Sequence, residues 1–277
     1  MRRLAAYIFL LTLVSLPVRA NAQSLGLYDD FSTKFIDPDK WLVLQDCGDA
    51  SRAYRECVLE TKGGQLRQEN RTYGNTDSNS GGNFSGVFLH FANPSTITAI
   101  KTDVVVKDFL ASGCQNNAGL TGQTRARLFG SFFNTDTPTA GSFVNDVTAS
   151  INLERQSSFT DPKNTLRVTA FAGVCSDASC SVGPSLGFLN LGTVSKGETV
   201  SLTIIWEQAN HRFKFTVSKP TPPQDVTDFI SYTVSDTAPS GANLKFVAVN
   251  NFSPNCTATP RPVAYMEALF DNVSVAP

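Results

Sequence analysis

Two arginines and a glutamine, spaced two residues apart in the middle of the chain, have the side-chain chemistry to bind acidic groups. Gln123, Arg125 and Arg127 alternate with small or apolar residues such as Ala126 and Leu128. Successive side chains of a strand point to opposite faces, so the three polar residues share one face. Guanidinium groups pair with carboxylates through two parallel hydrogen bonds, and amides pair with hydroxyls. The pattern therefore favours a surface for an acidic glycan.

The next two stretches repeat this alternation. Asn152 and Glu154 share one face of the second stretch, and Arg167 and Thr169 share one face of the third. Consecutive strands are usually neighbours, so we expect the three polar faces to lie side by side on an exposed sheet surface. The alternative is a salt-bridged surface that binds nothing. The predicted ligand-binding residues are Arg125, Arg127, Asn152, Glu154 and Arg167.

The elements that must position these residues are strands. Alternation of period two runs through most of the chain, and no long window has helical spacing. Residues 73–86, rich in Gly, Asn and Ser, are typical of one exposed loop. The strand-like runs are 95–110, 123–133, 147–155, 165–174, 199–206, 211–218, 226–234 and 243–250. This pattern predicts an all-β protein, an antiparallel β-sandwich of two sheets.

The two ends of the chain are expected to meet. The last apolar run, 265–275, is too short to bury itself, and the first apolar run, 25–31, is the partner that would close one sheet. If these runs pair, residues 23–277 form a single domain, which is an ordinary size for one β-sandwich.

Short motifs at both ends carry a family resemblance. Asp29-Asp30-Phe31, then Ile36-Asp37-Pro38-Asp39-Lys40-Trp41, and finally Phe270-Asp271-Asn272-Val273 resemble secreted members of the concanavalin A-like lectin/glucanase superfamily. The resemblance covers residues 25–276. It implies a jelly roll of two curved antiparallel sheets whose terminal strands are neighbours. Some members of this superfamily have a surface that faces sugars, and others have no catalytic activity, so the resemblance implies a fold more than a function.

Catalytic carboxylates of the expected kind are absent from the sequence. Laminarinase-like members of that superfamily carry an E-x-D-x-x-E strand, and this chain has none. Glu267 and Asp271 share a strand face, but four residues place them about 13 Å apart, beyond the roughly 5 to 9.5 Å of glycosidase pairs. We therefore interpret the protein as a non-catalytic carbohydrate-binding or surface-interaction module. The alternatives are a divergent carbohydrate-active enzyme, either a glycoside hydrolase or a polysaccharide lyase, and a structural envelope component.

The resemblance also implies a structural calcium ion, because relatives often hold one. Pairing of the chain ends would bring Asp29 or Asp30 close to Asp271, and adjacent carboxylates repel unless a cation lies between them. Calcium accepts six to eight oxygens in loose geometry. The alternative is that these aspartates only cap turns. No organic cofactor is expected.

Residues 1–22 are interpreted as a signal peptide that is cleaved after Ala22. Arg2 and Arg3 precede the apolar run 4–14, which falls short of the roughly 20 residues that span a bilayer. We expect a secreted or periplasmic protein with no membrane span after cleavage. Cleavage also removes Arg19, leaving 20 basic residues (23 − 3) against 24 acidic ones. This balance argues against a nucleic-acid partner.

The six cysteines follow the cleavage site, and an even number in an exported chain indicates three disulfides. Six cysteines allow 15 connectivities. Short separations favour Cys47 with Cys57 and Cys175 with Cys180, which leaves Cys114 with Cys256. Zinc is disfavoured because there is no C-x-x-C and only two histidines.

Overall fold

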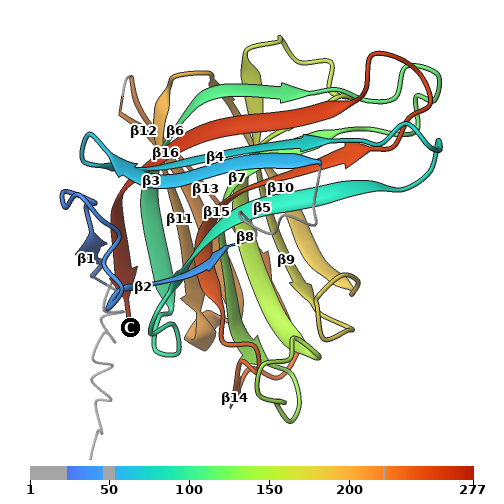
Figure 1. The fold of residues 1–277 in the computed structure, drawn as a ribbon. Coiled ribbons are helices and arrows are strands. Elements are labelled where there is room, and N and C mark those ends of the chain that lie inside the picture. The colour runs from blue at the N-terminus through green and yellow to red at the C-terminus, as the bar shows by residue number, and fades with distance from the viewer. Residues whose placement is uncertain (1–23, 46–53, 221) are drawn as a thin grey trace, which may run out of the picture.

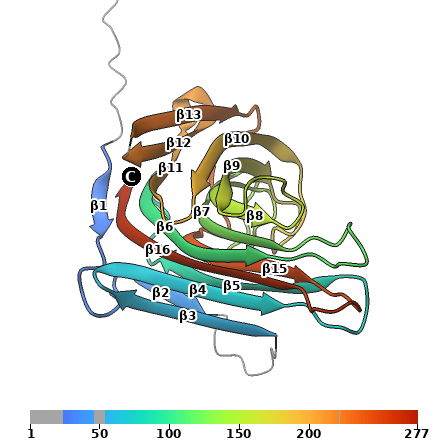
Figure 2. The same cartoon turned by 90° about the horizontal axis from the view of Figure 1, so that it is seen from above.

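Two antiparallel sheets pack face to face in the computed structural model, which describes residues 24–45, 54–220 and 222–277. Figures 1 and 2 show that both sheets are strongly curved. The predicted all-β sandwich is thus confirmed. The helical content of the described residues is one 3₁₀ turn, Gln208–Asn210, and none of their helices has the length and apolar character needed to cross a bilayer.

The first sheet contains the terminal strands. Its order is β13-β12-β11-β6-β16-β4-β3, and β1 pairs with β16 beside this path. The bounds are β1 Gly26–Asp29, β3 Arg55–Lys62, β4 Gln65–Tyr73, β6 Ala99–Ala111, β11 Thr199–Glu207, β12 Arg212–Pro220, β13 Pro223–Ser231 and β16 Val263–Ala276. Gly26 lies opposite Val275, so the predicted pairing of the chain ends is correct.

The second sheet carries the three polar stretches on adjacent strands. Its order is β10-β9-β8-β7-β15-β5-β2, and the short β14 pairs with β7. The bounds are β2 Trp41–Gln45, β5 Gly82–Phe91, β7 Gln123–Asn134, β8 Asp146–Gln156, β9 Thr165–Val174, β10 Ser185–Ser195, β14 Ala238–Pro239 and β15 Lys245–Pro254. The expected loop 73–86 is shorter than predicted, because its last five residues belong to β5.

The core lies between the sheets and explains the alternation along the strands. Leu128, Ile151 and Val168 of the second sheet meet Ile204 and Phe270 of the first, and all five are fully buried. Their neighbours in sequence on β7, β8 and β9 must therefore point to the opposite face of the second sheet.

Two disulfides join segments of the described chain. Cys114, after β6, is bonded to Cys256, after β15, across a separation of 142 residues. Cys175 and Cys180 close a short loop after β9. Both are pairs that the sequence predicts. The third predicted pair involves Cys47, which lies outside the described residues.

Candidate functional site

The predicted binding residues come together in a groove on the second sheet. All five line a cavity of about 1050 Å³. Arg125 lies opposite Glu154 and Arg127 opposite Asn152 across the β7–β8 pair. Arg167 lies opposite Glu154 across the β8–β9 pair. The face that bears them points away from the core, as the alternation requires.

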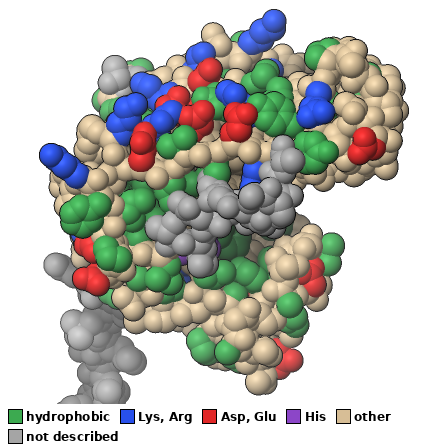
Figure 3. Space-filling model, in the orientation of Figure 1, with side chains coloured by type: hydrophobic (Ala, Val, Ile, Leu, Met, Phe, Trp, Pro, Cys, Tyr) green, Lys and Arg blue, Asp and Glu red, His purple; other side chains and the backbone are tan. Residues whose placement is uncertain are grey.

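This face is not the open surface that the sequence suggests. The sheet curves around it, so that Asn152 and Glu154 are only 4% and 6% exposed. In Figure 3 the molecule is hollowed across its middle, beneath a shelf of mixed acidic and basic side chains. Alternation fixes which side of a strand a residue occupies, but sheet curvature decides how much water reaches it.

The two central arginines have no anionic partner in contact. Within the described part of the chain, neither Arg125 nor Arg127 makes an ion pair or a side-chain hydrogen bond, and the Nε of each is buried without an acceptor. Burial lowers the pKa of both guanidinium groups. The charge of Arg125 lowers that of Arg127 further, and Glu154 opposes both effects. Arginine nevertheless stays charged in proteins, so the groove floor holds two uncontacted cations.

Glu154 is engaged by amides rather than by an arginine. Its carboxylate accepts hydrogen bonds from Gln123 Nε2 at 3.2 Å and Gln156 Nε2 at 3.3 Å. Burial raises the pKa of Glu154, although the charge of Arg125 works in the opposite direction. Glu154 therefore offsets one of the two arginine charges at a distance and leaves the other uncompensated.

Asn152 presents an unused acceptor to the groove. Its amide nitrogen is 3.4 Å from the Thr169 hydroxyl and 3.5 Å from Ser150 Oγ, while its Oδ1 is buried without a partner. Buried polar atoms are normally hydrogen-bonded, and one left free costs about 1 to 3 kcal/mol.

Arg167 forms a structural ion pair, as expected if the polar face were a salt-bridged surface. Its Nε donates to Asp161 at 2.7 Å, and its guanidinium carbon lies 3.9 Å from the Phe159 ring centroid. The charge of Arg167 is therefore already compensated at the edge of the groove. Of the three predicted arginines, the structure leaves two available to a ligand.

Beside the arginines lies an aromatic cluster that sequence analysis did not identify. Phe129 and Phe246 stack with centroids 4.6 Å apart, and Phe88 meets Phe246 edge-on at 5.2 Å. Phe143 adds a fourth ring, 6.3 Å from Phe129. The cluster is separate from the main core. A sequence signal existed, since Phe129 continues the face of Arg125 and Arg127.

His90, on β5, also lines the groove. It is 6% exposed, and its Nδ1 has no hydrogen-bond partner among the described residues. Burial lowers the pKa of His90 to about 4. The imidazole is therefore neutral at pH 7 and available to a ligand hydroxyl as donor or acceptor.

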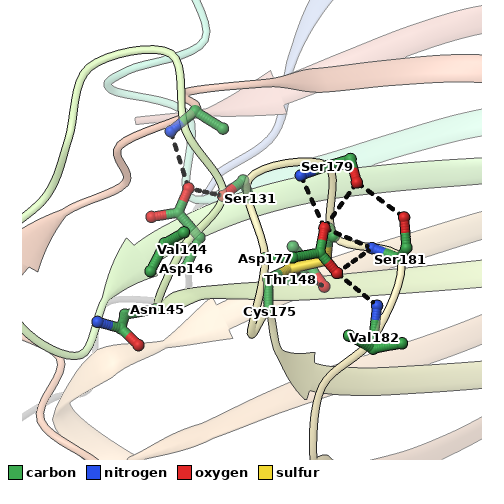
Figure 4. The surroundings of a disulfide bond; sticks show 12 residues. Ser131, Val144, Asn145, Asp146, Thr148, Cys175, Asp177, Ser179, Ser181 and Val182 are labelled. Carbon is green, nitrogen blue, oxygen red and sulfur yellow. Dashed lines mark hydrogen bonds between the residues drawn. A yellow bond between two sulfur atoms is a disulfide. The ribbon is translucent and has the colours of Figure 1, made fainter.

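One wall of the groove is the loop closed by Cys175 and Cys180, and Asp177 organises it (Figure 4). The Asp177 carboxylate accepts hydrogen bonds from the Ser179 hydroxyl at 2.6 Å, the Val182 amide at 2.9 Å and the Ser181 amide at 3.1 Å. These bonds lower the pKa of Asp177 to about 2. A disulfide and an ionised carboxylate together fix the loop against the sheet.

The three aspartates predicted to bind calcium do not fit a calcium site. Asp29 is 6% exposed, and its oxygens accept hydrogen bonds from Trp41 Nε1 at 2.6 Å and from the Phe31 amide at 3.0 Å. Asp271 and Asp30 interact electrostatically, as pairing of the chain ends requires. In the described ranges, however, no three His, Cys, Asp or Glu residues gather as metal ligands. Asp29 instead anchors Trp41 in the core.

The acidic residues considered as catalytic carboxylates lie apart from one another. Among the described residues, Glu154 is the one carboxylate that lines the groove, whereas hydrolysis by the usual mechanisms needs two. Glu267 lies on the other sheet, where it accepts a hydrogen bond from Arg67 at 2.7 Å. Trp206 stacks on Phe133 and donates to the Tyr232 hydroxyl at 2.7 Å, which places it in the packing of the core.

Comparison with known proteins yields similarity of fold. No family description matches the sequence, and no curated protein matches it. The structure is similar to lectin II from Ulex europaeus, with 14% identity over 88% of this chain and 98% of that chain, at a TM-score of 0.33. It is also similar to a GlcNAcα1-4Gal-releasing endo-β-galactosidase from Clostridium perfringens, with 13% identity over 93% of this chain and 65% of that one, at a TM-score of 0.41.

A third similar structure is the exoplasmic domain of VIP36 in a form bound to Ca²⁺ and Man3GlcNAc. The identity is 8% over 86% of this chain and 90% of that chain, at a TM-score of 0.37. The similar structures are thus two lectin-like proteins and one glycosidase. Similarity of this degree concerns the fold alone and says nothing of the ligand.

Proposed function

We propose that this protein is an exported, non-catalytic module that binds an acidic glycan in the groove of its second sheet. The observation that carries the proposal is the pair Arg125 and Arg127, two partly buried guanidinium groups without a contacting anion among the described residues. Burying a charge without a partner is costly, and a ligand carboxylate or sulfate would remove that cost.

The rest of the floor suits the hydroxyl groups of a sugar. Asn152 Oδ1 can accept a hydrogen bond, and the neutral His90 can donate or accept one. A cavity of about 1050 Å³ has room for more than one sugar ring. Several neutral polar groups around one net positive charge match a polyhydroxylated ligand that bears acidic groups.

Export rests on the signal-like residues 1–22 and on the disulfides. Disulfides persist in oxidising compartments, and two of them join described parts of this chain. The cleavage site after Ala22 lies outside the described residues and stays a prediction. Binding of a cell-surface polysaccharide in particular is part of the same proposal.

One observation favours a second candidate, a polysaccharide lyase. A lyase can work with one base and a group that neutralises the uronate, and His90 lies in a groove that also contains Arg125 and Arg127. A pKa of about 4 means that His90 is unprotonated at pH 7 and has the form of a base. The non-catalytic module remains our proposal because a pKa of about 4 makes His90 a weak base at neutral pH.

A glycan array followed by a product assay tests the proposal. We expect saturable binding to uronate or sulfated glycans, little binding to their neutral counterparts, and no unsaturated uronide or new reducing end on prolonged incubation. Product that disappears in His90→Ala would favour the lyase. Equal binding of neutral and acidic glycans would contradict an acidic ligand.

A further inference from the structure

The groove is divided along its strands into a charged half and an aromatic half. One face of β7 carries Arg125, Arg127 and Phe129 in order along the strand. The adjacent strand in the sheet, β15, places Phe246 beside Phe129. Eight phenylalanines line the groove in the described residues, compared with four charged side chains. A polar floor for an unsubstituted glycan would not need so much apolar surface.

The kind of aromatic residue is informative. Platforms for bare sugar rings gain from a polar tip that can reach a hydroxyl, as in tyrosine and tryptophan. The described lining contains neither of these and uses phenylalanine alone. Phe88 and Phe143 remain partly accessible around the stacked pair of Phe129 and Phe246. The cluster is thus open to a further apolar group.

The distance between Arg127 and Phe129 limits the separation of the anionic and apolar groups in a ligand that contacts both residues. Residues two apart on a strand lie about 6.6 Å apart, so Arg127 and Phe129 contact adjacent parts of a ligand. The Arg127 guanidinium carbon is in fact 4.8 Å from the centroid of the Phe129 ring. An anion and an apolar group that use both residues must belong to the same sugar unit or to neighbouring units.

We infer that the preferred ligand is an acidic glycan that carries an apolar ester substituent, with its anionic group at Arg125 and Arg127 and its acyl group on the Phe88, Phe129, Phe143 and Phe246 cluster. This inference rests on the proposed function and specifies its ligand. The net charge of the floor supports it, since two arginines against Glu154 leave one positive charge, which suits one anion per bound segment.

Calorimetric titration with a series of esters tests the inference. The probes are polymannuronate and polygalacturonate, each unesterified and as O-acetyl, O-propionyl and O-butyryl esters of equal substitution. We expect affinity to rise roughly fourfold for each CH₂ that the cluster buries, the ratio that corresponds to about 0.8 kcal/mol per CH₂. The rise should stop when the acyl chain exceeds the cluster.

Variants show whether the gain arises at the cluster. Phe143→Ala should flatten the ester series by lowering the affinity for esterified polymers more than that for unesterified ones, and Phe88→Leu should flatten it in part. Leu110→Ala removes a half-exposed apolar side chain from β6 on the other sheet, and it should leave the whole series unchanged.

The possible failures can be told apart. Equal affinity for esterified and unesterified polymers would overturn this inference and leave the proposed function standing. Failure of every polymer to bind would overturn both. Free butyrate binding as tightly as the butyryl polymer would show that the groove takes small amphipathic anions instead, which also overturns the inference.

Discussion

The guanidinium group of Arg127 lies over the ring of Phe129, 4.8 Å from its centroid, at the junction of the two halves of the groove. A cation over an aromatic face is attracted by about 0.5 to 2 kcal/mol, which is less than a contacting carboxylate can supply to a buried arginine. Phe129 therefore orients Arg127 without satisfying its hydrogen-bond donors. An anionic ligand would complete the site.

Replacing Arg125 and Arg127 together by alanine should abolish glycan binding and leave the melting temperature within a few degrees. Hydrogen bonds to charged groups contribute about 1.5 to 3 kcal/mol each, so each single variant should weaken binding about 10- to 100-fold. Calorimetry and thermal melting measure both effects. Arg71→Ala is the matched control, because Arg71 pairs with Glu56 on the other sheet. A large loss of stability with unaltered binding would show that the two arginines are structural.

Sequence alternation was sufficient to place the five predicted binding residues on one face, because parity along a strand depends only on local geometry. The alternation could not reveal that Arg167 forms an ion pair, since its partner Asp161 lies in the preceding turn. Nor could it reveal that Arg125 and Arg127 form no ion pair among the described residues. Such pairing depends on rotamers and sheet curvature. The aromatic cluster was missed for a similar reason. Phe246 lies on β15 and Phe88 on β5, and both strands are distant from β7 in sequence. In the sheet, β15 is adjacent to β7 and β5 is adjacent to β15.

Pairing of the chain ends was predicted correctly, although β1 pairs with β16 over a short stretch and the main partners of β16 are β6 and β4. The partner of Asp29 was not predictable, because the sequence does not show the direction of a carboxylate. Asp29 turns inward to Trp41. Glycine-rich residues 82–86 were expected in a loop, but ladder pairing with β15 holds them in β5 despite their low strand propensity.

Asp177→Ala should loosen the wall of the groove without unfolding the protein. The hydrogen bonds from Ser179, Ser181 and Val182 lower the pKa of Asp177 to about 2, below the usual value near 3.9. Their stabilising effect is therefore fully present above about pH 4 and is lost as the pH falls towards 2. Amide exchange of Ser181 and Val182 at pH 6 should accelerate in the variant. Unchanged exchange would show that the Cys175–Cys180 disulfide alone holds the loop.

Lys245 should make stability rise with pH on the alkaline side. It is 2% exposed and donates to the carbonyls of Pro94 and Ser131, each at 3.0 Å. Burial lowers its pKa to about 7, although Asp146 opposes the shift. An unfolded lysine titrates near 10.4, so between about pH 7 and pH 10 the unfolded chain binds more protons and the folded state gains stability as pH rises. The free energy of unfolding, measured with denaturant at pH 6 and pH 9, should rise more in the wild type than in Lys245→Met. Equal slopes would contradict the shift.

Replacing both Cys114 and Cys256 by serine should lower the free energy of unfolding by about 5 kcal/mol, because their bond closes a loop with a sequence separation of 142 residues. For a chain of this size the melting temperature should fall by roughly 10 to 20 °C. The matched control replaces Cys175 and Cys180, whose loop is short and should contribute less. If the control pair cost as much as the long-range pair, loop entropy would not be the main source of the stabilisation.

Chelation of divalent cations should leave the melting temperature unchanged, because Asp29 is committed to Trp41 and Phe31. Asp29→Ala should destabilise the protein by about 1 to 3 kcal/mol, since the buried Trp41 Nε1 would lose its acceptor. Melting curves with and without chelator, recorded for both proteins, make the comparison. A fall in the melting temperature of the wild type alone would restore the calcium interpretation of Asp29.

The most direct measurement of the central claim is calorimetric titration of the wild type and of the Arg125→Ala, Arg127→Ala double variant with an acidic oligosaccharide selected on the array, at two salt concentrations. We expect saturable binding to the wild type that weakens with salt, and none to the double variant. Binding of equal strength to both proteins, or binding indifferent to salt, would contradict the claim that these two arginines hold an anionic glycan.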